Sequence, residues 1–143
     1  MGNKKILIVE DDGDVRRGYH VRLKANNYDT FFAVDAIGSL REARAHQPDL
    51  IILDLGLPGG DGFVVMERLK TNPQLAVIPI IVVTGRSGLA NQTRAMEAGA
   101  SAFLEKPVDN DDLLAAIRRI LGGPVQLEKA EFLPGPKRRR VLL

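Results

Sequence analysis

The chain has 143 residues, enough for one domain, and 45% of them are hydrophobic, enough to bury a sizeable core. It contains no cysteine and two histidines, which excludes disulfides and thiolate metal sites and argues against a histidine-rich zinc site. The formal net charge is +2, but residues 137–140 alone contribute four positive charges, so the rest of the chain is slightly acidic.

The N-terminal sequence MGNKKILIVE leads directly into a short apolar run, without the long apolar region of a secretory signal. No apolar run approaches the roughly 18 residues needed to span a membrane. We therefore expect no membrane association. The lack of cysteine suits the reducing cytoplasm, which is the location we predict.

Five short segments are predicted to form β-strands. The first, third and fourth are apolar runs, the fourth interrupted only by Pro79. Such runs are typical of strands buried on both faces of a parallel sheet. The second and fifth are weaker signals. In chain order the predicted strands are residues 6–9, 30–34, 50–53, 78–83 and 102–104.

A helix is predicted after each strand, because apolar residues recur there at helical spacing. The second helix should follow an N-cap at Asp35, and the fifth an N-cap at Asp109 or Asn110, ending at Gly122 and Gly123. The recurring residues are Val15, Tyr19 and Leu23; Ala36, Leu40 and Ala43; Phe63, Met66 and Leu69; Leu89, Thr93 and Met96; and Leu113, Leu114, Ile117 and Leu121.

Five successive strand–helix units predict an α/β fold, a doubly wound parallel sheet with strand order 2-1-3-4-5. Residues 1–123 would form this domain. The helical and strand patterns stop at Pro124, and residues 124–143 contain further prolines and the basic cluster. We expect this segment to be a C-terminal tail or linker remnant, and the basic cluster to be solvated rather than bound to nucleic acid.

Polar residues follow four of the predicted strands where the strands end. In a sheet of this order, those ends converge at one edge. Crowded carboxylates repel, so one would protonate unless a cation neutralised them, and Mg²⁺ suits a site of carboxylates, a carbonyl and waters. An ammonium and a hydroxyl beside an aspartate add the elements of a phosphoryl site. These residues are Glu10, Asp11 and Asp12, then Asp54, Thr84 and Lys106.

Four segments together resemble the response-regulator receiver domains of two-component signalling, in their chemotaxis-regulator-like form, over roughly residues 4–122. The segments are ILIVEDD (6–12), PDLIILDLGLPGGDG (48–62), IPIIVVTGRS (78–87) and AGASAFLEKP (98–107), in the family's order and spacing. The resemblance implies a flavodoxin-like receiver fold. It also implies a phosphoprotein that catalyses only its own phosphorylation and dephosphorylation, and is not otherwise an enzyme.

The resemblance further implies that Asp54 accepts a phosphoryl group from a sensor histidine kinase or a phosphotransfer protein. Glu10, Asp11 and Asp54 would hold Mg²⁺ together with the backbone carbonyl of Gly56. Thr84 and Lys106 would bind the phosphoryl group. Thr84 and Phe103 would then switch the surface of the fourth helix, fifth strand and fifth helix for a downstream protein target or effector domain.

Some residues leave alternatives open. Glu10, Asp11 and Asp12 could form a helix N-cap cluster, which is the role we expect for Asp12, and Phe103 could be plain core packing. Glu10 stands where Asp is also common, and its longer arm should reach a metal through water. Arg86 is expected to lie over the phosphoryl group and slow its loss, against the open path left by Gly56.

The sequence argues against three other classes of protein. A haloacid-dehalogenase-type phosphatase needs a D-x-D-x-T segment, and a flavodoxin needs a Ser/Thr/Gly loop; the segment EDDGD at 10–14 provides neither. A DNA-binding regulator needs a further domain after Gly123. Two alternatives follow for this chain. It acts alone through protein partners, or it is a receiver module truncated from a longer DNA-binding or enzymatic regulator. Nucleic-acid binding is not expected for this chain alone.

Overall fold

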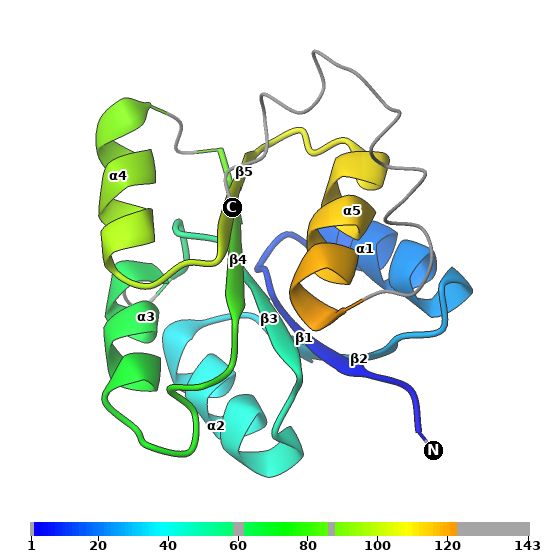
Figure 1. Cartoon of the computed structure of the whole chain (residues 1–143), viewed down its shortest axis with the longest axis horizontal. Coiled ribbons are helices and arrows are strands. Elements are labelled where there is room, and N and C mark those ends of the chain that lie inside the picture. The colour runs from blue at the N-terminus through cyan, green and yellow to red at the C-terminus, as the bar shows by residue number, and fades with distance from the viewer. Residues whose placement is uncertain (1, 59–61, 86–87, 123–143) are drawn as a thin grey trace.

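The computed structural model describes residues 2–58, 62–85 and 88–122 and confirms the predicted α/β class and strand order (Figure 1). None of the helices in these ranges is long and apolar enough to cross a membrane. The elements are β1 Lys5–Val9, α1 Gly13–Ala25, β2 Asp29–Ala33, α2 Ala36–His46, β3 Leu50–Leu53, α3 Gly62–Lys70, β4 Ile80–Thr84, α4 Leu89–Glu97, β5 Ala102–Glu105 and α5 Asn110–Leu121.

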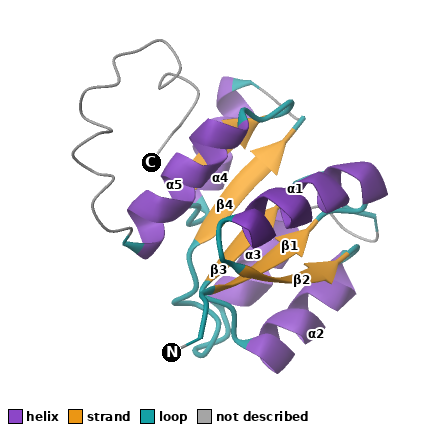
Figure 2. Ribbon diagram, turned by 90° about the vertical axis from the view of Figure 1, so that its right-hand side faces the viewer, coloured by secondary structure: helices purple, strands orange, loops and turns teal. Residues whose placement is uncertain are grey.

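The five parallel strands lie in the order β2-β1-β3-β4-β5, with α1 and α5 on one face of the sheet and α2, α3 and α4 on the other (Figure 2). Because strand side chains alternate between faces, β1 serves both layers. Leu7 and Val9 pack with α2 and α3, whereas Ile6 and Ile8 pack with α1 and α5. The continuous apolar runs therefore exist because the central strands are covered twice.

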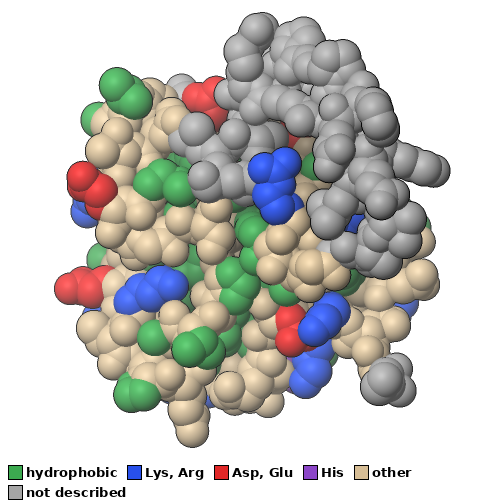
Figure 3. Space-filling model, viewed as in Figure 1, with side chains coloured by type: hydrophobic (Ala, Val, Ile, Leu, Met, Phe, Trp, Pro, Cys, Tyr) green, Lys and Arg blue, Asp and Glu red, His purple; other side chains and the backbone are tan. Residues whose placement is uncertain are grey.

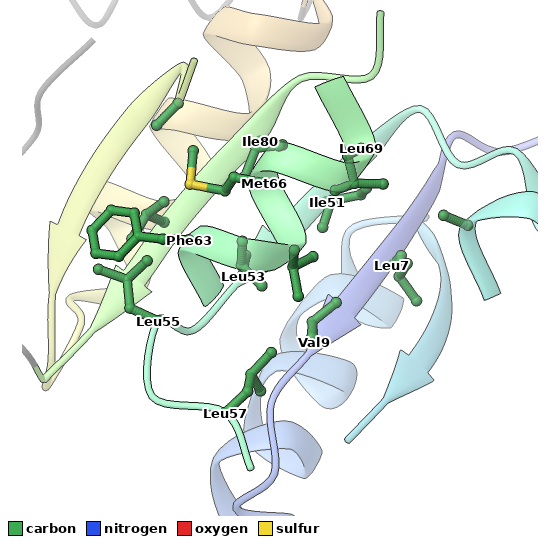
Figure 4. Packing of buried hydrophobic residues seen from close by; sticks show 14 of the residues in the cluster. Leu7, Val9, Ile51, Leu53, Leu55, Leu57, Phe63, Met66, Leu69 and Ile80 are labelled. Carbon is green, nitrogen blue, oxygen red and sulfur yellow. The ribbon is translucent and has the colours of Figure 1, made fainter. Parts of the chain in front are cut away.

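The layer formed by α3 shows how this packing is achieved. Phe63, Met66 and Leu69 recur at helical spacing and point to the sheet, where they meet the side chains of Leu53 and Ile51 (Figure 4). Met66 and Leu69 are almost fully buried. Burial of each such side chain contributes about 1.5–3 kcal/mol, so this face of α3 fixes the start of the helix close to the end of β3.

The helix ends follow the sequence prediction. Asp12 caps α1 by accepting bonds from Asp14 N (2.9 Å) and Val15 N (3.2 Å), and Asp35 caps α2 through Gly38 N (2.7 Å). Asp109 rather than Asn110 caps α5, since its carboxylate accepts from Asp111 N and Asp112 N. The helix α5 ends at Gly122, whose φ of 80° favours glycine.

The bounds of four strands differ from the prediction by one or two residues. The largest difference is in β4, which begins at Ile80 rather than at residue 78. The amide of Ile78 donates to Leu75 O in a turn, and Pro79, which has no N–H, contributes only its carbonyl, to Ile51 N. β2 ends at Ala33, one residue earlier than predicted. β1 and β5 are each one residue longer than predicted, β4 ends one residue later, and β3 has the predicted bounds.

The prediction for the inward face of α4 was right for Met96, which packs against the core, but wrong for Leu89 and Thr93. Leu89 is 76% exposed and Thr93 is also exposed, whereas the small side chain of Ala95 is fully buried. Apolar side chains are accordingly visible at the surface over this helix (Figure 3). Gly88, at the N-cap position, makes no side-chain cap bond. A second attachment comes from Arg94, whose guanidinium carbon lies 3.8 Å from the ring centroid of Phe63.

Arg94→Ala should lower the free energy of unfolding by about 0.5–1 kcal/mol, because it removes the cation–π contact that joins α4 to α3. Chemical denaturation measures the change. Arg44→Ala is the matched control, since Arg44 is also an exposed cation in the last turn of a helix. Equal losses for the two variants would mean that the ring contact adds nothing beyond the helix dipole.

Candidate functional site

The backbone ladder places three of the predicted site residues. Each lies one residue beyond the end of its strand and is still held by a hydrogen bond to the neighbouring strand. Glu10 N donates to Ala33 O (3.0 Å), Asp54 N donates to Val9 O (3.1 Å), and Lys106 N donates to Thr84 O (3.0 Å). Because the paired strands are parallel and in register, these side chains emerge at the same edge of the sheet.

The side chains converge as the sequence predicted. Carboxylate oxygens of Glu10, Asp11 and Asp54 all lie within 4.8 Å of one another. Lys106 Nζ donates to Glu10 Oε1 at 2.6 Å and to Asp54 Oδ2 at 3.0 Å. Thr84 is fully buried and its hydroxyl is hydrogen-bonded to Asp54. One edge of the sheet thus holds three acids, a cation and a hydroxyl.

Asp54 is held as a carboxylate. Burial alone would raise its pKa, but the N–H of Gly56 (3.1 Å to Oδ1), the hydrogen bond and charge of Lys106, and the bond to Thr84 outweigh that effect. The pKa of Asp54 therefore lies below its ordinary value of 3.8. At neutral pH the side chain is ionised and able to act as a nucleophile.

Glu10 has a different environment. Both of its oxygens are engaged, Oε1 by Lys106 and Oε2 by Asp12 N at 3.1 Å. Burial raises its pKa, although Lys106 opposes the shift. The pKa values of the two buried acids are therefore shifted in opposite directions, because the hydrogen bonds from Gly56 N–H and Lys106 help to outweigh burial for Asp54, whereas burial dominates for Glu10. That Glu10 reaches a metal through water stays a prediction, and its side-chain contacts in this structure are Lys106 Nζ and Asp12 N.

The donor set fits a magnesium ion. All three acidic groups offer hard oxygen ligands, and Asp11 is exposed, so an ion that keeps several waters has access. Within the described chain, the Asp11 carboxylate makes no hydrogen bond or ion pair. Asp11 is accordingly the residue most ready to bind a cation directly. The Gly56 carbonyl stays a prediction as a further ligand.

Of the remaining predicted residues, Phe103 lies away from this cluster and Arg86 lies outside the described residues. Phe103 is 2% exposed and belongs to the same apolar cluster as Phe63, so its place is compatible both with core packing and with a moving aromatic. Arg86, predicted to shield a phosphoryl group, lies outside the described residues, as does the segment 124–143.

Sequence reasoning missed two residues near the acids. Tyr19, chosen only as a core residue, is buried, and its pKa is raised by burial and by the charges of Glu10 and Asp54. Arg16 Nη1 donates to Glu10 O at 2.9 Å and lies 3.4 Å from Asp11 O. The available signal was position, since a side chain in the first turn of a helix can reach back over the preceding loop.

The structure should lose stability as pH rises above about 10, because of Tyr19 and Lys106. Burial would lower the pKa of Lys106, but Glu10 and Asp54 raise it above its ordinary value of 10.5. The pKa of Tyr19 is also raised, from 10.0. Both groups therefore release their protons more readily in the unfolded chain, and the stability they contribute is complete below these values and lost above them.

Tyr19→Phe should flatten this alkaline decline, because phenylalanine has no proton to release. Denaturant titrations at pH 8 and at several values above pH 10 provide the two curves. An identical slope for wild type and variant would show that Tyr19 does not contribute.

A family model described as the response regulator receiver domain matches residues 6–118. The chain is 37% identical over 117 residues to the DNA-binding dual master transcriptional regulator RpaA of Synechocystis sp., covering 82% of this chain and 48% of RpaA. It is 39% identical over 113 residues to the KDP operon transcriptional regulatory protein KdpE of Escherichia coli, covering 79% of this chain and 49% of KdpE.

Among solved structures, the response regulator receiver domain protein (CheY-like) from Methanospirillum hungatei aligns with a TM-score of 0.78 and 31% identity. The alignment covers 90% of this chain and 99% of that chain. The chain thus spans about half the length of the two curated relatives but nearly all of this neighbour.

Proposed function

This chain belongs to the response regulator receiver domain family, and on that premise we propose that it is a magnesium-dependent phosphoacceptor. Asp54 accepts a phosphoryl group from a sensor histidine kinase or a phosphotransfer protein. The observation that carries the proposal is the environment of Asp54, an ionised carboxylate bonded to Lys106 and Thr84 and close to two further acids.

In the proposed reaction, a carboxylate oxygen of Asp54 forms a bond to phosphorus, and the bond from phosphorus to the donor's histidine nitrogen breaks. The low pKa of Asp54 keeps the attacking oxygen unprotonated. Lys106 and Thr84 already contact the carboxylate, so they are placed to contact the phosphoryl oxygens as charge develops there. Mg²⁺ held by Asp11 and Asp54, with Glu10 beside them, would neutralise part of that charge.

The proposed output is a change on the surface of α4, β5 and α5. Thr84 is the last residue of β4, and its contact with Asp54 links the site to the segment that leads to α4. Ala95 is the one fully buried side chain of α4, so this helix is lightly attached to the core. Phe103 on β5 would be the second moving part, for recognition by a downstream protein or effector domain.

We propose that the chain has no other enzymatic activity and acts through protein partners in the cytoplasm. Because it spans about half the length of RpaA and KdpE, the alternative is a receiver module whose output domain belongs to a longer regulator. Both readings use the same site. They differ in the partner that the α4–β5–α5 surface contacts, which would be another protein or a domain of the same polypeptide.

The proposal is tested by incubating the purified protein with acetyl phosphate and measuring its intact mass. One phosphoryl adduct should form with Mg²⁺ and should be absent with EDTA. No adduct in Mg²⁺ would overturn the proposal. Sustained turnover of p-nitrophenyl phosphate would instead indicate a phosphatase.

Asp11→Ala should weaken Mg²⁺ binding more than any other single acid-to-alanine change outside Asp54, because its carboxylate is exposed and uncommitted. The wild-type dissociation constant should lie in the millimolar to sub-millimolar range, on the order expected of a site that keeps several waters. Isothermal titration calorimetry gives both values. Asp14→Ala, an equal loss of charge three residues away, is the control, and equal affinities for the two variants would rule out the assignment.

A further inference from the structure

We propose that Arg16 is a positioning residue for the magnesium site, holding the loop that carries Glu10 and Asp11 so that their carboxylates face Asp54. The inference deepens the proposed function and rests on it, since it concerns the same metal site. The observation behind it is the guanidinium of Arg16, whose Nη1 donates to Glu10 O at 2.9 Å and lies 3.4 Å from Asp11 O.

The loop carbonyls are open to such a donor because the sheet ends there. The carbonyl of Val9 still bonds to Asp54 N, but the carbonyls of Glu10 and Asp11 come after the last paired residue of β1. Backbone carbonyls that leave a ladder require another partner. Arg16 lies in the first turn of α1, where its own N–H donates to Asp12 O (2.9 Å), and its side chain returns over the loop.

The bonds around this loop leave one acid free to turn. Glu10 N is fixed by Ala33 O, and Glu10 Oε2 accepts from Asp12 N. Asp12 itself is fixed by capping α1. Asp11 has no comparable side-chain contact within the described residues, so the direction of its carboxylate depends on the peptide planes on either side. Arg16 contacts the carbonyls of those two planes.

The two possible effects of Arg16, its positive charge and its positioning of the loop, predict opposite changes in Mg²⁺ affinity when the residue is removed. A positive charge near a cation site opposes cation binding, so removing it should strengthen Mg²⁺ binding if charge alone matters. If Arg16 positions the acids, removing it should weaken binding. Arg17 supplies the matched comparison, because it adds the same charge one residue later but is exposed and contacts Asp14 at 3.5 Å.

The experiment compares Arg16→Met, Arg16→Lys and Arg17→Met by Mg²⁺ titration, following the amide signals of Asp11 and Gly56. Arg16→Met should raise the dissociation constant about tenfold, as for other residues that orient metal ligands. Arg16→Lys should recover part of the affinity, and Arg17→Met should match or slightly exceed wild type. Equal affinities for the two methionine variants, or tighter binding by Arg16→Met, would overturn the inference.

Thermal unfolding in EDTA separates positioning from general stability. Arg16→Met should remain folded, with metal-free amide shifts altered around residues 10–12. If it fails to fold, Arg16→Lys decides, and wild-type affinity in that variant would contradict a role for the two-carbonyl contact. Failure of the proposed function would look different, as a wild-type protein that binds Mg²⁺ but is not labelled by acetyl phosphate. A wild-type protein that binds no Mg²⁺ would overturn the inference as well.

Discussion

Asp54→Asn is expected to abolish labelling by acetyl phosphate or phosphoramidate in Mg²⁺. The amide has no negative charge and is a poor nucleophile, and no other acid in the cluster has the same contacts. Asp54 alone combines bonds to Lys106, Thr84 and Gly56 N–H. Glu10 is tied to Lys106 and Asp12 N, and its pKa is raised. Phosphoryl incorporation is measured by intact mass over time.

Asp49→Asn is the control for this change. Asp49 directly precedes β3, at the opposite edge of the sheet from Asp54, where its carboxylate accepts from Lys5 N at 2.8 Å. An asparagine there keeps an acceptor oxygen, so the variant should fold and be labelled at the wild-type rate. Labelling of Asp54→Asn at the wild-type rate would remove Asp54 from its assigned role.

Lys106→Ala is expected to have the largest effect on stability and to separate phosphorylation from its structural consequence. The ammonium is bonded to two buried carboxylates, at 2.6 Å and 3.0 Å. Removing it leaves those charges without a counter-ion, which should cost about 3 kcal/mol at neutral pH. The loss should shrink at acid pH, because protonation removes the charges. Mg²⁺ should stabilise this variant more than wild type, since it supplies the missing positive charge.

The same variant should accept some phosphate but lose the response that follows. Lys106 and Thr84 are the groups placed to pull on the phosphoryl oxygens, so without Lys106 the movement of the β4–α4 segment should be incomplete. Amide shifts around residues 84–105 before and after phosphorylation report the response. Lys24→Ala, at an exposed cation on α1, controls for loss of charge. Unchanged phosphorylation-induced shifts in Lys106→Ala would place the coupling elsewhere.

Much of the fold could be predicted because a strand buried on both faces of a sheet appears in the sequence as an uninterrupted apolar run. Residues 6–9 and 50–53 are apolar without interruption, and both are fully covered in the structure. The position of the site followed from the same logic. Once the strands are parallel, in the order 2-1-3-4-5, the residues after their carboxyl ends must meet, and Glu10, Asp54 and Lys106 do so.

The rest depended on contacts that spacing does not encode. The inward face of α4 is set by Ala95, whose small side chain lets the helix approach the core, while the larger Leu89 remains outside. The bond between Lys106 and Glu10 joins residues 96 positions apart, a separation that the spacing of motifs does not reveal. Arg16 contacts backbone carbonyls, which every residue has, so the sequence does not indicate which carbonyls it would bind.

The most direct test of the central claim is to find the phosphorylated residue chemically. An acyl phosphate on aspartate is reduced by borohydride to the alcohol, which converts the residue to homoserine. The protein would be labelled with acetyl phosphate in Mg²⁺, reduced, digested and sequenced by mass spectrometry. The account predicts homoserine at position 54 and nowhere else, and none in EDTA. Homoserine at position 11, 2-amino-5-hydroxypentanoic acid at position 10, or a phosphoryl group that resists borohydride would contradict it.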